Sequence, residues 1–198
     1  MASFFKHLSS IFSSHCTMNK SMTLMLMVGM LALVGCTQGN VELDNAGEES
    51  LRAIIDELPY QMPGGTFQRI SLEPGLHSLV VQDMQGEIKG ETTFQVTEGG
   101  LINLAREPYY IWVDLYGDTT LRSTQLQEDW VTIGNESFYG QFEPVDTAVY
   151  YVERRWDYGL DESFPNDLYG WKITQEKWII KRKLFRQEGL VKSYKAMF

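Results

Sequence analysis

Cysteine and histidine are scarce in this sequence, which has two cysteines and three histidines among 198 residues. Four of these five residues lie in the first part of the chain: His7, His15, Cys16 and Cys36. Residues 37–198 therefore cannot form an internal disulfide, a cysteine metal site or a multi-histidine metal site, and we expect no metal and no cofactor there. A Ser-His-Asp triad would have to use His77, but no nucleophile signature accompanies it. We expect His77 to be a partly exposed strand residue.

Long hydrophobic runs are also missing, apart from one near the start of the chain. The uncharged run from Ser21 to Gly35 is shorter than the about 20 apolar residues that a membrane-spanning helix needs. It follows the positively charged Met18-Asn19-Lys20 and ends in small residues. This order of a positive end, an apolar middle and a small-residue cleavage site is typical of a secretory signal peptide. We predict a signal peptide over residues 1–35, with Met18 as an alternative start that gives a more usual length.

The end of this leader, Leu33-Val34-Gly35-Cys36, resembles the lipobox of bacterial lipoproteins. The resemblance implies cleavage before Cys36, a diacylglyceryl group on its sulfur and usually an acyl chain on its freed amine. Two or three chains hold a protein stably on a bilayer, whereas one chain binds weakly. Thr37 follows the cysteine in place of an acidic residue, which favours the outer membrane in bacteria with lipoprotein sorting. We therefore expect a lipid-anchored protein of the bacterial cell envelope.

The remaining chain divides by composition into a short polar segment and one domain. Residues 36–47 are polar apart from Val41 and Leu43 and predict a lipidated tether. Residues 48–198 suit a single β-rich domain. Its last part, 172–198, is a basic C-terminal segment.

A short helix is expected where this domain begins. Asn45 can cap such a helix, Glu48 stands in the capping-box position and Pro59 can end it. The predicted apolar stripe consists of Leu51, Ile54, Ile55 and Leu58. Packing of this stripe on the protein's own sheet is the interpretation we prefer over a partner-binding helix.

From Thr66 onward, alternating apolar and polar residues between turn sequences predict strands. The expected strands cover 67–72, 76–82, 91–97, 101–105, 109–115, 130–133, 137–142 and 147–155. The segment 176–185 suits a strand through Ile179 and Ile180, but a helix through Trp178, Lys181 and Phe185 is an alternative. The fold class that follows is mainly β: an antiparallel sandwich or open barrel with one short N-terminal helix.

Two segments in this region have a loose family resemblance. Residues 70–81, Ile-Ser-Leu-Glu-Pro-Gly-Leu-His-Ser-Leu-Val-Val, and 94–99, Phe-Gln-Val-Thr-Glu-Gly, are similar to the second half of PEGA-type small β-sandwich modules. The usual opening strand with its Pro-Gly-Ala type turn is not evident. The resemblance implies a hairpin-rich sandwich and an extracytoplasmic adhesion or scaffolding role.

Charge is unevenly distributed along the chain. Residues 37–171 contain 24 acidic and 7 basic residues, whereas 172–198 contain 8 basic and 2 acidic ones. The acidic body argues against nucleic-acid binding, which needs a dominant positive face. The basic segment could meet phosphate groups of lipid or lipopolysaccharide, but we expect it to pair with the protein's own acidic body.

The most unusual segment of the domain is 156–171, which mixes large aromatic residues with carboxylates, glycines and a proline. Its rings and carboxylates could bind a glycan, its oxygens could hold calcium, or its rings could pack the loop onto the sandwich. Packing is the interpretation we prefer, and the EF-hand spacing is absent. The candidate ligand-binding residues are Trp156, Asp157, Tyr158, Asp161, Tyr169 and Trp171.

These features together predict a non-enzymatic, membrane-anchored envelope lipoprotein whose β-rich domain is an interaction or scaffold module. Its expected partner is another envelope protein or a cell-wall component. A lipoprotein that binds a glycan or small ligand through the loop 156–171 is the alternative. Catalysis by paired carboxylates, as in glycoside hydrolysis, is a weaker alternative because nearly every acidic surface offers such pairs.

Overall fold

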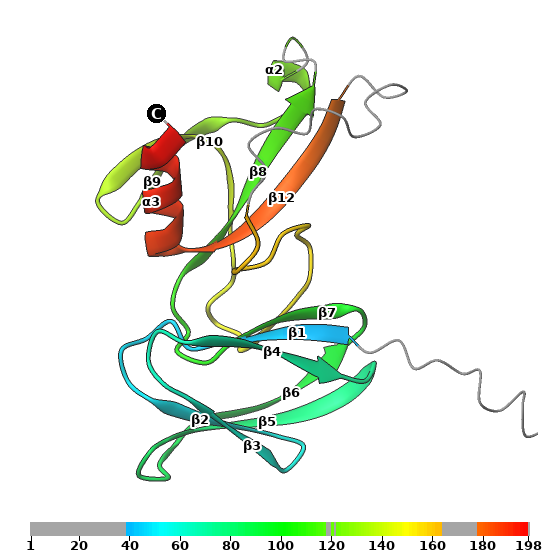
Figure 1. Cartoon of the computed structure of the whole chain (residues 1–198), viewed down its shortest axis with the longest axis vertical. Helices are drawn as coiled ribbons and strands as arrows, with labels where there is room; N and C mark the ends of the chain where they lie inside the picture. The colour runs from blue at the N-terminus through cyan, green and yellow to red at the C-terminus, as the bar shows by residue number, and fades with distance from the viewer. Residues whose placement is uncertain (1–38, 118–119, 121, 164–177, 198) are drawn as a thin grey trace, which may run out of the picture. The chain divides into compact units, whose positions relative to one another are not determined.

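The computed structural model describes residues 39–117, 120, 122–163 and 178–197, all within the unit Thr37–Phe198 (Figure 1). The strands are β1 (Gly39–Asp44), β2 (Leu51–Ile55), β3 (Leu58–Met62), β4 (Phe67–Leu72), β5 (Gly75–Asp83), β6 (Ile88–Val96), β7 (Gly99–Asn103), β8 (Tyr109–Gly117), β9 (Asp129–Ile133), β10 (Glu136–Pro144), β11 (Tyr151–Glu153) and β12 (Trp178–Arg186). Two helices, α2 (Arg122–Gln125) and α3 (Gln187–Met197), complete the described elements.

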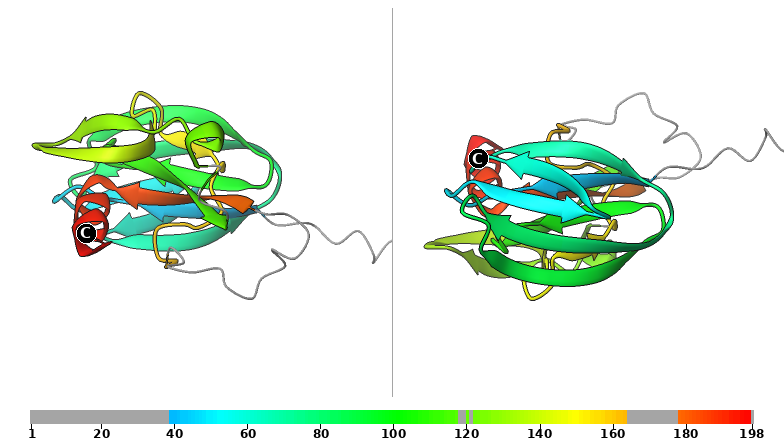
Figure 2. Two further views of the ribbon diagram at one scale, coloured as in Figure 1. Left: turned by 90° about the horizontal axis from the view of Figure 1, so that it is seen from above. Right: turned by 90° about the horizontal axis from the view of Figure 1, so that it is seen from below.

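The first two sheets form a sandwich. The first sheet has the strand order β11-β7-β1-β4 and the second has β3-β2-β5-β6. Viewed from below in Figure 2, the cyan and green strands of the second sheet lie in front of the blue β1. One core lies between them, with Val41 and Leu43 of the first sheet, and Ala53, Leu79 and Val81 of the second, among its fully or almost fully buried members. The predicted mainly β, sandwich-like class is confirmed, and the sheets do not close into a barrel.

The prediction that residues 36–47 form a tether is wrong from Gly39 onward. Gly39–Asp44 form β1, which pairs antiparallel with β4 and parallel with β7 inside the first sheet. Val41 and Leu43 have no exposed surface. The polar residues of this segment misled the prediction, because Glu42 and Asp44 are buried as well.

The predicted N-terminal helix is also wrong, because its residues form the β2–β3 hairpin. Leu51, Ala53 and Ile55 alternate into the core, which is the strand period of two and not the helical period. The hairpin turns through Asp56 (φ 47°) and Glu57 (φ 71°), both in the left-handed region that a two-residue type I′ turn requires. Pro59, expected to end a helix, lies in edge strand β3, where a missing N–H is tolerated.

The third sheet has the order β12-β8-β10-β9, and α3 packs on one of its faces. Aromatic residues dominate that contact, with Trp112, Phe138 and Phe142 buried next to Leu190 and Tyr194 of α3. The opposite face shares a core with the first sheet. This core contains Tyr109, Ile111, Val113 and Leu184 of the third sheet together with Leu101 of β7. The first sheet is therefore covered on both faces, which explains why every residue of β7 is buried.

The strands predicted between Thr66 and Phe142 are confirmed, with shifts of a few residues at their ends, whereas of the strand predicted over 147–155 only Tyr151–Glu153 form β11. β4 has the predicted bounds 67–72, and β12 shows that 178–186 is a strand and not a helix. Helix α3 was not predicted, because 187–197 has only a modest apolar face around Leu190 and Val191.

Candidate binding groove

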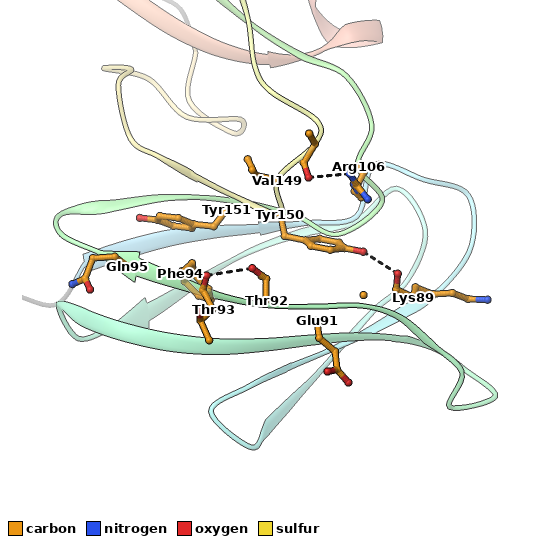
Figure 3. Close-up of a pocket in the computed structure, with 12 residues that line it drawn as sticks. Lys89, Glu91, Thr92, Thr93, Phe94, Gln95, Arg106, Val149, Tyr150 and Tyr151 are labelled. Atoms are coloured by element: carbon orange, nitrogen blue, oxygen red, sulfur yellow. Dashed lines mark hydrogen bonds between the residues drawn. The ribbon is translucent and has the colours of Figure 1, made fainter.

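An open groove of about 530 Å³ lies where the first and second sheets end side by side (Figure 3). One wall is β6, the last strand of the second sheet, and the other is the segment Ala148–Tyr151, which leads into β11 at the end of the first sheet. Aromatic rings and polar side chains both line it, including Phe94, Tyr150 and Arg106. Phe94 and Tyr150 are themselves buried, at 6% and 9% exposure, so the surface of the groove is formed mainly by polar side chains and by the edge of β6.

Two tyrosines bridge the edges of the two sheets. The ring of Tyr151 lies 4.7 Å from that of Phe94, its hydroxyl donates to the carbonyl of Gly99 (2.9 Å), and burial raises the pKa of Tyr151 to about 12. The hydroxyl of Tyr150 donates to the carbonyl of Lys89 (3.2 Å). A Cβ at Gly90 would overlap the Tyr150 ring, so glycine is needed for this close approach. These contacts therefore hold both tyrosine rings in fixed positions between the two sheets.

Arg106 fixes the loop that forms the rim of the groove. Its backbone is in the left-handed region (φ 57°). Its guanidinium donates to the carbonyls of Thr147 (3.0 Å) and Ala148 (2.9 Å) and lies 5.4 Å from the centre of the Tyr150 ring. The cation–π contact and the two hydrogen bonds hold the loop against the tyrosine.

The outer edge of β6 presents backbone groups toward the groove side. The backbone N–H of Ser78 donates to the Asp56 carboxylate (2.8 Å) and its carbonyl accepts from the Asp56 N–H (3.3 Å), so both groups of Ser78 point toward β2. Ser78 pairs with Thr93, and the backbone groups of Thr93 consequently point away from β5. Because this direction alternates along a strand, the backbone N–H and C=O groups of Glu91 and Gln95 also point away from β5.

Among the described strands, β6 is the longest edge strand whose edge is largely uncovered, with Tyr150 covering it only around Lys89 and Gly90. β12 has the same length and also ends a sheet, but the segment around Tyr158 covers its edge with hydrogen bonds to Arg182 and Leu184. β3 is shorter and carries Pro59, which protects an edge from further pairing. Sequence reasoning missed the groove because its walls are more than fifty residues apart in the chain; the signal that could have indicated it is Tyr150-Tyr151 beside an edge strand.

The ligand-binding residues predicted from the sequence do not lie in this groove. Trp156 is 5% exposed and packs in the core between the first and third sheets, so its ring cannot stack on a ligand. Asp157 binds the ammonium of Lys181 (3.1 Å), Tyr158 pairs with β12, and Asp161 binds Arg69 (2.5 Å). The other two candidates, Tyr169 and Trp171, lie outside the described residues. For Trp156 the packing interpretation is confirmed.

A buried ionic cluster holds this loop against the two sheets. Burial raises the pKa of the Glu42 carboxyl. Its Oε2 accepts a hydrogen bond from the N–H of Leu160 (3.4 Å). Its Oε1 has no hydrogen bond among the described residues and lies 3.8 Å from the guanidinium of Arg69. Burial lowers the pKa of Lys183 to about 8, and its ammonium donates to the carbonyl of Gly159. These contacts tie the loop to β1 and β12, which is a structural role.

The basic C-terminal segment pairs with the acidic body, as expected. The recorded ion pairs are Lys181 with Asp157, Arg182 with Glu143, Arg186 with Asp44 and Lys195 with Glu136. The Arg186 pair is the most buried of these, since Asp44 has no exposed side-chain surface. Most described cations of this segment are thereby engaged within the protein.

His77 clamps the β2–β3 hairpin. One ring nitrogen lies 2.5 Å from the Asp56 carboxylate and the other 2.7 Å from the carbonyl of Glu73. Both neighbours can only accept hydrogen bonds, so the doubly protonated ring satisfies both. Burial alone would lower the pKa of His77, but these hydrogen bonds outweigh burial and hold it above its usual value.

A pH-dependent contribution to stability follows from this raised pKa. The contribution is fully present below the unfolded pKa of about 6.5 and is lost as the pH rises through the folded pKa. We expect the difference in unfolding free energy between the wild type and His77→Gln to shrink as the pH increases from mildly acidic to mildly basic. Urea unfolding of both proteins across that range measures it, and a difference that grows with pH would contradict the clamp.

Comparison with known proteins gives no family for this chain. No protein-family model, curated protein or solved structure matches the sequence or its fold. The resemblances to lipoprotein leaders and to PEGA-type modules therefore stay predictions. In the part of the chain that the structure describes, no group of three or more His, Cys, Asp or Glu could hold a metal ion, and no helix is long and apolar enough to cross a membrane.

Proposed function

We propose that this chain is a lipid-anchored protein of the bacterial cell envelope whose domain binds an extended segment of another envelope protein. The segment adds as a strand to the outer edge of β6 and places alternate side chains in the groove. The observation that supports this most is the juxtaposition of the β6 edge, at Glu91, Thr93 and Gln95, with a groove of about 530 Å³. Strand addition derives affinity from main-chain hydrogen bonds and specificity from pockets for alternate side chains.

The composition of the groove favours a peptide over an apolar small molecule. Polar side chains along β6 line the groove, whereas the rings of Phe94 and Tyr150 are almost fully buried. Small-ligand pockets are usually enclosed and mostly apolar, whereas this groove is open and follows a strand. A role in scaffolding is the function this supports, without a catalytic step.

The location in the envelope rests on the leader and on Cys36. The lipobox-like sequence Leu33-Val34-Gly35-Cys36 is the basis for lipid attachment, and Thr37 favours the outer membrane. A glycan of the cell wall is the alternative ligand. The burial of Trp156 removes one of the two tryptophans on which that alternative depended.

Replacing one edge residue tests strand addition directly. Thr93→Pro removes an N–H that points away from β5, so it blocks an added strand but leaves the β5–β6 pairing in place. The matched control, Thr93→Ala, keeps the N–H. A photoreactive residue at Gln95 reports contact in cells, and the same residue at Gln61 on edge strand β3 controls for proximity.

We expect one crosslinked envelope protein from Gln95, unchanged by Thr93→Ala and reduced by about tenfold by Thr93→Pro, which corresponds to about 1.4 kcal/mol of binding free energy. Circular dichroism and thermal melting verify that both variants fold. Equal crosslinking in Thr93→Pro and Thr93→Ala, or equal capture from Gln61 and Gln95, would contradict binding at β6.

A further inference from the structure

The fold begins almost immediately after the predicted lipid-bearing residue. β1 starts at Gly39, and only Thr37 and Gln38 separate it from Cys36 in the sequence. Three residues span at most about 11 Å when fully extended. A lipid on Cys36 therefore holds the residues around Gly39 close to the bilayer. The connection is too short to act as a flexible linker between the bilayer and the domain.

One end of the sandwich surrounds Gly39. Gly39 pairs with Leu72 at the end of β4, and a Cβ placed on it would touch Val96 and Glu98. In Figure 1 β1 begins where β4 ends and β5 starts. The turns at this end are Asp56–Glu57, Glu73–Pro74 and Thr97–Glu98, as the registers of β2 with β5 and of β5 with β6 require. We call these turns, with Leu58 and Leu76, the anchor end.

The anchor end contains Leu76 and Leu58, which are the most exposed leucines among the described residues. Leu76 follows the Glu73–Pro74 turn and is 71% exposed, and Leu58 follows the hairpin turn and is 61% exposed. The Asp56–His77 clamp fixes the hairpin turn between them. Single exposed apolar residues are common on protein surfaces, so what sets these two leucines apart is their closeness to the predicted lipid anchor.

We infer that the anchor end rests on the bilayer, with Leu76 and Leu58 in contact with the lipid headgroup region. This inference depends on the proposed lipid attachment at Cys36. The short distance between Cys36 and Gly39 brings these side chains to the bilayer surface, where transfer of their methylene groups out of water is favourable. The leucines thus orient the domain, while the acyl chains supply the attachment.

The charge of the anchor end selects the kind of lipid surface. Glu57, Glu73 and Glu98 are exposed there, and carboxylates near a membrane are repelled by anionic headgroups within the Debye length. A zwitterionic surface is therefore the favoured one. In this orientation β6 runs from Val96 at the membrane to Ile88 at the far end, so the open edge remains accessible to a partner.

The test uses lipidated full-length protein reconstituted in phosphatidylcholine vesicles. Leu76→Cys and Met84→Cys variants each carry one environment-sensitive dye. Met84 is the matched control, since it is also an exposed apolar residue and lies beyond the opposite end of the same strand, β5. A nine-residue strand separates the two positions by roughly 30 Å. Leu58→Cys provides a second position at the anchor end.

We expect a headgroup-attached quencher to reduce the dye signal at Leu76→Cys and Leu58→Cys about fivefold more than at Met84→Cys, because only the first two lie at the surface. Anionic phosphatidylglycerol should weaken this difference. Equal quenching at both ends, or more at Met84→Cys, on a protein with acylated Cys36 would overturn the orientation and leave the anchor standing. An unmodified Cys36 thiol in the mass spectrum would overturn both.

Discussion

Leu43→Ala is expected to lower the free energy of unfolding by about 3 kcal/mol, within the range for truncation of a buried leucine. Leu43 has no exposed surface and packs in the core between the first and second sheets. It also lies in β1, which joins β4 and β7. The loss combines the transfer free energy of the removed methyl groups with the cavity they leave. Urea denaturation of the purified domain, analysed by linear extrapolation, measures it.

Asn40→Ala is the matched control for Leu43→Ala. Asn40 lies in the same strand but is exposed, and surface substitutions usually change stability by about 0.5 kcal/mol or less. If β1 were a tether, as the composition of residues 36–47 predicts, neither substitution would matter. Two variants as stable as the wild type would therefore contradict the fold at its first strand, and with it the short distance between Cys36 and the domain.

Arg186→Met is expected to cost about 3 kcal/mol as well, because it leaves a buried carboxylate without its charged partner. The guanidinium of Arg186 donates to both oxygens of Asp44, one of them through Nε at 3.0 Å, and to the carbonyl of Gly65 at 2.9 Å. Asp44 is fully buried and also accepts the hydroxyl of Tyr109. This cluster joins β1 of the first sheet to β8 and β12 of the third.

Two further variants separate charge from geometry in this cluster. Arg186→Lys keeps the charge but loses the bidentate contact, so we expect a smaller loss than for Arg186→Met. Adding Asp44→Asn to Arg186→Met removes the unpaired charge, and the double variant should recover part of the loss. An Arg186→Met protein as stable as the wild type would show that the pair does not hold the sheets together.

Most of the strands after Thr66 could be predicted from the sequence, because one face is buried and the other is exposed. Residues 67–72 illustrate this, with Ile70 and Leu72 buried and Arg69 and Ser71 exposed. β1 has no such pattern, because both of its faces are covered. Its buried Asp44 is neutralised by Arg186, about 140 positions later in the chain. Nothing local in the sequence indicates that pairing.

The N-terminal helix prediction failed because its apolar positions fit two periods. Leu51 and Ile55 lie four apart, which suits a helix, but they also belong to the alternating set with Ala53 that packs in the core. Asp56 and Glu57 gave no hairpin signal, since asparagine and glycine are the usual residues of such turns. The clamp from His77 to Asp56 supplies the support that the turn residues lack.

No residue of the candidate groove was predicted as a binding residue, although two expectations about other parts of the chain were right. The packing of Trp156 and the pairing of the basic segment followed from composition and charge, and the structure confirms both. The groove could not be predicted, because it depends on β6 and the segment around Tyr150 ending two different sheets at the same place. Which strand lies at an edge is a property of topology, and topology is not encoded in any short stretch of residues.

The intact mass of the protein extracted from bacterial membranes tests the central claim most directly. The account predicts a polypeptide that begins at Cys36 and carries the added mass of a diacylglyceryl group, with or without a further acyl chain. A chain that begins at Met1 or Met18 with a free thiol at Cys36 would contradict lipid attachment, the envelope location and the orientation of the anchor end.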